Sequence, residues 1–328
     1  MQKGNLELTS CSRESQSFYI LSRDYRSSLL MKFPLRVWNS VAVLLCLLAT
    51  VPAVLAQTGS PSLFDQAGIP GAQVYSDMKA AVKDGDAVYK CQFINAPFDP
   101  KLLPKITRLT NLQCLAIGAN GVSQLPLIFT GFRGLLYFSS FKNAFTELPP
   151  EIGALQSLMY LELSDTKLSV LPASFSELSR LKSFQLQNNG ADTFRLPSTV
   201  GELTALTDLV LDHVNLDSLP PAFTGLSKLQ HLYLDHTRLK VLPRSFGKLT
   251  QLQSLVLDNC QLTELPKSFF KLGNLGYLSL KNNRIVHISD YICYLTNLAE
   301  LDLSGNPISE QDRAILHALL PGCRIIYQ

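Results

Sequence analysis

One spacing dominates this chain: a leucine returns at the same phase every 23 residues along more than half of its 328 residues. The leucines that open successive units are Leu112, Leu135, Leu158, Leu181, Leu206, Leu229, Leu252, Leu275 and Leu298. Every step is 23 residues except the step of 25 after Leu181. Such a period is typical of a solenoid, in which each unit buries its apolar face against the next unit.

The unit at 229–251, "LQHLYLDHTRLKVLPRSFGKLTQ", shows how one repeat divides its residues. Its opening Leu-x-x-Leu-x-Leu predicts a short strand, and side chains alternate across a strand. Leu232 and Leu234 therefore lie on one face, and His231 and Tyr233 lie on the other. We expect the leucines to form the core and the intervening residues to line a second face.

This pattern resembles the leucine-rich-repeat family, in its 23-residue LxxLxLxxNxLxxLPxxIGxL type found in Ras-suppressor-like and many bacterial proteins. The Leu-Pro step in "ELPPEIGAL", "VLPASFSEL" and "SLPPAFTGL" carries the second half of that motif. The resemblance implies an α/β-type solenoid of horseshoe form. Its concave side is a parallel β-sheet, its convex side is irregular or 3-10 helical, and helical caps close both ends.

The ninth position of each unit is mostly polar inside a wall of leucine. It is occupied by Asn120, Asn143, Thr166, Asn189, Val214, Thr237, Cys260, Asn283 and Asn306. In the family this side chain is buried at a bend, where it bonds to backbone groups that lack ladder partners. Val214 cannot do this, so we expect one bend to be satisfied differently. The extra two residues before Leu196 predict a local loop, with a functional protrusion as the alternative.

The repeat pattern divides the exported part of the chain into three segments. Residues 57–87 are expected to form an N-terminal cap with a short helix at about 76–83. Residues 88–308 form the solenoid, with a degenerate first repeat at 88–111 and nine repeats from 112. Residues 309–328 form a C-terminal cap, in which a helix precedes a closing strand.

The start of the chain has a different character. Residues 31–56 combine basic residues, an apolar stretch and a small-residue exit, which predicts a secretory signal peptide cleaved after Ala56. Residues 1–30 are polar and without pattern, so we interpret them as disordered and as the product of an incorrectly assigned upstream start, with Met31 as the initiator. The alternative is an uncleaved membrane anchor at 37–56, which is long enough to span a bilayer.

Composition argues against several functions. The net charge is +3 without a basic run, so nucleic acid is not an expected partner. Five cysteines would remain after processing, and they lack the CxxC or CxH spacing of a structural zinc site. A bridge between Cys293 and Cys323 stays open as an alternative. The sequence contains no phosphate-binding loop or nucleophile elbow, so we expect neither catalysis nor a cofactor.

The candidate binding residues are those at the third, fifth and seventh positions, which line the concave face. One group gathers in three successive units: Asp208, Asp212, His231, Tyr233, Asp235 and Asp258. We call Asp212, Asp235 and Asp258 the aspartate ladder, because strands about 4.8 Å apart set these like charges side by side. A second group, the aromatic end, comprises Tyr137, Phe141 and Tyr160.

These residues predict a recognition surface rather than a reactive site. The sharper alternative is a metal site drawn from Asp208, Asp212, His213, His231, Asp235 and His236. We do not expect one, because the sequence has no tight ligand signature. The favoured function is a non-enzymatic exported recognition module that binds a protein partner with a basic patch. The alternatives are a membrane-anchored surface adhesin, a glycan-binding protein, and an effector or enzyme-regulating scaffold.

Overall fold

The computed structural model describes residues 63–95 and 97–328. Every described residue belongs to one compact unit, Gly59–Gln328. The predictions for 1–30, for the signal peptide at 31–56, for the anchor at 37–56 and for the first six residues of the N-terminal cap lie outside the described residues. Within the described part, no helix is both long enough and apolar enough to cross a bilayer.

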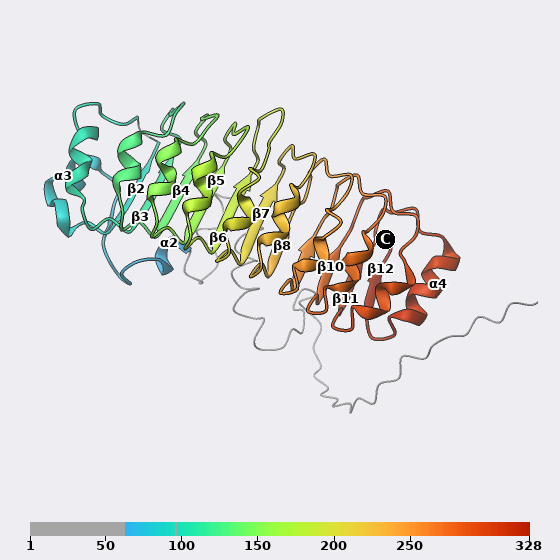
Figure 1. Cartoon of the computed structure of the whole chain (residues 1–328). Helices are drawn as coiled ribbons and strands as arrows, with labels where there is room; N and C mark the ends of the chain where they lie inside the picture. The colour runs from blue at the N-terminus through green and yellow to red at the C-terminus, as the bar shows by residue number, and fades with distance from the viewer. Residues whose placement is uncertain (1–62, 96) are drawn as a thin grey trace, which may run out of the picture. The chain divides into compact units, whose positions relative to one another are not determined.

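All strands of the described unit form one parallel sheet in which each strand pairs with its neighbours in the sequence (Figure 1). The strands are β1 Val74–Tyr75, β2 Lys90–Ile94, β3 Cys114–Gly118, β4 Tyr137–Phe141, β5 Tyr160–Ser164, β6 Ser183–Gln187, β7 Asp208–Asp212, β8 His231–Tyr233, β9 Ser254–Val256, β10 Tyr277–Ser279, β11 Glu300–Asp302 and β12 Arg324–Ile326. From β2 to β11, each repeat contributes one strand at a constant phase, so the sheet grows one rung at a time.

The second half of most repeats winds into a short 3-10 turn. These turns are η1 Gly85–Ala87, η2 Leu103–Arg108, η3 Leu127–Gly131, η4 Pro150–Ala154, η5 Ala173–Glu177, η6 Val200–Glu202, η7 Pro221–Gly225, η8 Phe246–Lys248, η9 Lys267–Lys271 and η10 Asp290–Tyr294. In the repeats that contain it, the Leu-Pro step favours the start of the turn, because proline fixes φ and lacks an N–H; η1 and η10 begin without it. In η5, Pro172 has φ −65°, and the N–H of Phe175 bonds to its carbonyl at 3.0 Å.

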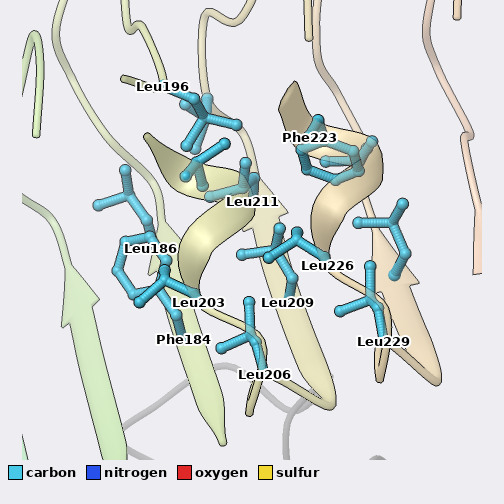
Figure 2. Close-up of a cluster of buried hydrophobic side chains, with 14 of the residues drawn as sticks. Phe184, Leu186, Leu196, Leu203, Leu206, Leu209, Leu211, Phe223, Leu226 and Leu229 are labelled. Atoms are coloured by element: carbon cyan, nitrogen blue, oxygen red, sulfur yellow. The ribbon is translucent and has the colours of Figure 1, made fainter. Parts of the chain in front are cut away.

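The space between the sheet and the 3-10 turns is filled by the repeated leucines and phenylalanines (Figure 2). Leu232 and Leu255 are fully buried on adjacent strands. The turn phenylalanines are buried in this core, and the Phe246 and Phe269 rings of successive turns lie 5.9 Å apart and nearly parallel. The predicted fold class, a leucine-rich-repeat solenoid with a parallel sheet opposite 3-10 turns, is confirmed.

Buried side chains at the ninth position hold the bends together. The amide of Asn283 donates to the carbonyls of Leu257 and Leu280 at 2.7 and 2.9 Å, and its oxygen accepts from the N–H of Leu262 at 3.0 Å. At the unit with Val214, the neighbouring Asn215 takes over and donates to the carbonyl of Ala191 at 2.9 Å. One bend is therefore satisfied differently, as the sequence predicted.

The two-residue insertion is bound into the solenoid instead of forming a free loop. Phe194 is 1% exposed, and its N–H bonds to the carbonyl of Asn215 at 2.9 Å. Arg195 in turn makes a parallel bridge with Val170. The sequence predicted a local loop here because glycine and aspartate are turn formers, and burial of the Phe194 ring holds this loop against the core.

The remaining helices lie towards the two ends of the described unit. They are α2 Leu63–Gln66, α3 Met78–Asp84 and α4 Glu310–Leu319. Asp77 caps α3 by accepting from the N–H of Lys79 at 2.6 Å, and Ser309 caps α4 by accepting from the N–H of Asp312 at 3.1 Å. Strand β12 then closes the sheet beside β11.

The C-terminal cap differs from its predicted form in two details. The expected apolar stripe of α4 comprised Ile315, Leu316, Leu319 and Leu320. Leu316 and Leu320 are buried, whereas Ile315 is 38% exposed. Cys323 is a thiol whose Sγ contacts the carbonyl of Arg324, so the alternative bridge to Cys293 does not form. Packing of α4, without a covalent staple between these two cysteines, therefore closes this end.

The packing of Leu232 supports a stability prediction. Replacing Leu232 by Ala should lower the free energy of unfolding by about 2 to 5 kcal/mol, because a fully buried side chain leaves a cavity between neighbouring repeats. Val241 of the same repeat is 59% exposed, and its replacement by Ala should change stability by less than about 0.5 kcal/mol. Chemical denaturation of both variants measures the difference. Equal effects would contradict the division into core and surface.

Candidate binding face of the sheet

The aspartate ladder lies at one edge of the concave face, where successive rungs of the sheet end. Asp212 is the last residue of β7, and Asp235 and Asp258 follow β8 and β9 at the same phase. Backbone hydrogen bonds continue past the shorter strands. The N–H of His213 donates to the carbonyl of Asp235 at 3.1 Å, and the N–H of His236 donates to that of Asp258 at 3.1 Å. The three carboxylates are thus held in register by the main chain.

Each carboxylate of the ladder already has a hydrogen-bond partner within the chain. Asp212 Oδ1 lies 2.7 Å from His213 Nδ1, and Asp235 Oδ1 lies 2.9 Å from both His236 Nδ1 and Asn259 Nδ2. Donors within the protein therefore stabilise these carboxylates and reduce the cost of placing like charges side by side. Side-chain exposures of 27% for Asp212 and 31% for Asp235 leave both carboxylates accessible to a partner.

Asp258 is the ladder carboxylate whose surroundings disfavour its charge. Burial raises its pKa, and the charges of Asp235 and Asp302 raise it further. Hydrogen bonds from Ser279 Oγ at 2.5 Å and from the N–H of Lys281 at 2.9 Å act in the opposite direction. A cation placed over this end of the ladder would relieve the repulsion, which is the electrostatic basis for a basic partner.

The residue after each ladder position adopts a left-handed backbone. Positive φ recurs at this phase in Ala119, Lys142, Asp165, Asn188, His213, His236, Asn259 and Asn282. His213 and His236 both have φ 51°, and their rings stack at 4.0 Å between centroids with an angle of 15° between planes. The repeated turn therefore builds a second row of side chains beside the ladder, and two imidazoles meet in it.

Two predicted binding residues are less accessible than the sequence indicated. His231 is 3% exposed and Tyr233 is 4% exposed. Tyr233 lies between Val210 and Val256 on the paired strands, and its hydroxyl shares a hydrogen bond with Ser254 Oγ at 3.0 Å. Side chains at the central positions crowd one another because the strands are only about 4.8 Å apart. Tyr233, a candidate binding residue from the sequence, is therefore part of the packed surface of the sheet.

Asp208 remains partly accessible at the start of β7. It pairs in register with His231 of β8, and its carboxylate accepts from the hydroxyl of Thr207 at 2.5 Å. Asp208 and His231 therefore sit on the same rung, at the opposite end of the strand from the ladder. Of the six residues grouped from the sequence, the four aspartates are half-buried, and the other two lie beneath the surface.

The aromatic end is covered by a segment from the N-terminal side of the chain. Tyr137 is 5% exposed, and the ring of Phe64 in α2 packs edge-on against it at 5.5 Å. Two further contacts hold the segment in place. Lys90 Nζ donates to the carbonyls of Phe64 and Asp65 at 3.1 and 2.9 Å, and Cys114 Sγ lies 3.3 Å from the carbonyl of Ala67.

Because of this cover, much of the aromatic end packs against the chain itself. Phe64, Ala67, Cys114, Ala116 and Tyr137 form a hydrophobic cluster of their own on the concave side, against which Tyr160 packs. The sequence placed residues around 57–87 in a cap and did not predict that part of them would lie on the sheet. Phe141 stays half-buried, with its ring packed against the backbone of Gly118, where a Cβ would clash.

Three concave residues near the C-terminal end were not singled out from the sequence, and two of them, Glu300 and Asp302, extend the acidic surface. Tyr277 and Glu300 pair in register between β10 and β11, and Asp302 lies further along β11. Burial and the charges of Asp258 and Glu300 raise the pKa of Tyr277 to about 12. Arg324 of β12 contacts Glu300 at 3.0 Å. The sequence could have identified Tyr277, Glu300 and Asp302, because they occupy the same repeat positions as the predicted binding residues.

Comparison with protein-family models agrees with this architecture. A model described as leucine rich repeat matches residues 204–262 and 250–308. A second, described as leucine-rich repeat region, matches residues 135–232. Between them the two models account for the chain from 135 to 308.

Individual relatives match shorter parts or match through the fold. The putative disease resistance RPP13-like protein 3 of Arabidopsis thaliana is 40% identical over 78 residues, which are 24% of this chain and only 9% of that protein. A leucine-rich-repeat protein of Leptospira interrogans is 20% identical with a TM-score of 0.54, over 78% of this chain and all of that one. The ectodomain of the Arabidopsis thaliana membrane receptor kinase GASSHO1/SCHENGEN3, solved in complex with CASPARIAN STRIP INTEGRITY FACTOR 2, is 27% identical with a TM-score of 0.51, over 62% of this chain and 25% of that chain.

The cover over the aromatic end predicts a change in thiol reactivity. Replacing Phe64 by Ala removes about 1.5 kcal/mol of apolar burial, so the segment should open more often and labelling of Cys114 should rise about tenfold. Burial raises the pKa of Cys114 to about 11, which keeps it unreactive in the parent protein. Mass spectrometry after timed alkylation measures each site.

Cys91 is the internal control for this measurement. It is fully buried in the main core, and burial raises the pKa of its thiol to about 12. Its labelling should stay unchanged in the Phe64→Ala variant. Equal labelling of Cys114 in both proteins would show that α2 does not cover this part of the sheet. A rise at both cysteines would indicate general unfolding.

Proposed function

Because this chain belongs to the leucine-rich-repeat family, we propose that it is a non-enzymatic recognition protein whose concave face binds a basic patch on a protein partner. Leucine-rich-repeat domains commonly act as protein interaction modules. The observation that carries the proposal is the aspartate ladder, a row of partly exposed carboxylates held in register by the rungs of a rigid sheet. Prepositioned side chains lower the ordering cost of binding.

Of the two halves of the concave face, the C-terminal half is the better candidate for the binding surface. At the aromatic end, Phe64 and Ala67 already occupy the surface around Tyr137. From Asp212 to Asp302 the carboxylates remain partly exposed. A basic partner would be steered towards this half and would offset the charge repulsion around Asp258. The same charges repel phosphate backbones, which argues against nucleic acid as a partner.

Measurement of partner binding with and without the ladder charges tests the proposal. Asp212, Asp235 and Asp258 are changed together to Asn, which keeps size and hydrogen-bond acceptors while removing three charges. Proteins captured from the surroundings of the producing cell by parent and variant are compared by quantitative mass spectrometry. We expect basic partners to be depleted at least tenfold on the variant. We also expect their affinity for the parent protein to fall steeply with salt.

A matched charge control separates the ladder from net charge. Glu151, Glu177 and Glu202 lie in the 3-10 turns η4, η5 and η6 and are exposed, so their joint change to Gln removes the same charge from the opposite side. This control should retain every partner. Equal capture by the ladder variant and the parent, with unchanged salt dependence, would reject the ladder as the binding site.

We also propose that the protein is exported, on the strength of the sequence pattern of residues 31–56. The mature chain should begin at Gln57, because the small-residue exit ends at Ala56. N-terminal sequencing of the protein recovered outside the cytoplasm measures this directly. A chain that retains residues 37–56 and fractionates with membranes would favour the anchored form instead. Peptides from residues 1–30 would contradict initiation at Met31.

A further inference from the structure

The stacked imidazoles beside the ladder form a cluster that protein recognition does not require. One ligand atom from each of Asp212, His213 and His236 lies within 4.8 Å of the other two. No metal site was expected from the sequence, because it contains no compact ligand motif. Folding brings the cluster together, because its two histidines belong to successive repeats and are 23 residues apart in the sequence.

Carboxylates lie beside both histidines. Asp235 Oδ1 lies 2.9 Å from Nδ1 of His236, which favours the tautomer with the proton on Nδ1 and leaves Nε2 as a metal donor. In His213, Nδ1 is hydrogen-bonded to Asp212 Oδ1 at 2.7 Å, so an ion that replaces the shared proton would meet both atoms. A carboxylate behind an imidazole fixes its tautomer and orientation and raises its basicity as a ligand, as it does at zinc centres.

The remaining geometry is also compatible with coordination. The rings lie 4.0 Å apart and nearly parallel. Imidazole lone pairs lie in the plane of the ring, so the two rings must rotate out of their stack before both can point at one ion about 2 Å from each nitrogen. Side-chain exposures of 50% for His213 and 44% for His236 leave room for that movement.

We propose that Asp212, His213 and His236 bind a divalent transition-metal ion of the Zn²⁺ class, with Asp235 orienting His236. Two imidazoles and one carboxylate match the donor preference of such ions, whereas Ca²⁺ and Mg²⁺ prefer oxygen ligands alone. The open side of the cluster leaves a coordination position for water or for a donor from a partner. The ion also adds positive charge beside the ladder, so metal and basic partner would oppose each other.

Isothermal titration of the untagged full chain with Zn²⁺ tests the site. We expect one ion per chain with the ligands present. The His213→Ala and His236→Ala variants should each weaken binding more than tenfold, and Asp235→Ala should weaken it about tenfold through the lost orientation. Saturating Zn²⁺ should raise the melting temperature of the parent protein but not of the histidine variants.

His287 supplies a matched control. Its Nδ1 lies 2.7 Å from Asp312, and its side chain is 58% exposed, so it forms the same histidine–carboxylate pair without a stacked second imidazole. The His287→Ala variant should bind Zn²⁺ as the parent does. The absence of stoichiometric binding, or equal affinity in the parent and the His213→Ala/His236→Ala double variant, would overturn the proposal.

The spectrum of the Co²⁺-substituted protein identifies the donors independently. Nitrogen and oxygen ligation should give visible absorption without a thiolate charge-transfer band. A thiolate band that survives the double variant would place the metal on cysteine and would reject this site. Because the histidine variants keep all three ladder aspartates, their loss of metal leaves the recognition proposal to be judged separately by the ladder variant.

Discussion

The structure depends on contact between the buried leucines of neighbouring repeats. A single unit of about 23 residues cannot enclose its own apolar face, so each unit is stable only between two others. Leu232 and Leu255 illustrate this, since they lie on paired strands of successive units and are fully hidden from solvent. The ninth-position side chains then satisfy the backbone at the bends, where the sheet ends. The 3-10 turns complete the enclosure with their phenylalanines.

The same contact determines what the concave face can present. Because every rung is fixed by the core beneath it, residues of equal phase lie beside one another over long sequence distances. Asp212, Asp235 and Asp258 become a row in this way, and the left-handed residue that follows each of the first two brings His213 and His236 into contact. Contacts with the neighbouring imidazoles then stabilise Asp212 and Asp235, and this allows the row to persist at modest cost.

The concave face is divided between internal and external use. Around Tyr137 it packs against the chain's own N-terminal side through Phe64 and the Lys90 contacts. Around the ladder it carries charges that remain partly hydrated. The ladder half of the concave face stays partly exposed while the aromatic end is covered, so a partner protein can reach only the ladder half without displacing the cover. The negative charge of that half favours a basic partner.

The 23-residue spacing by itself determined the solenoid, the inward leucines and the rows of equal phase, because these depend only on strand alternation and on repetition. The parallel sheet was implied by the resemblance to the leucine-rich-repeat family. It also identified Val214 as an exception, although Asn215 as the substitute appeared only in three dimensions. Tertiary structure decided accessibility and pairing: the burial of Tyr233, the enclosure of Phe194, the cover over Tyr137, and the meeting of His213 with His236. These outcomes depend on crowding between rungs, on backbone handedness and on contacts between distant segments, none of which has a periodic signal in the sequence.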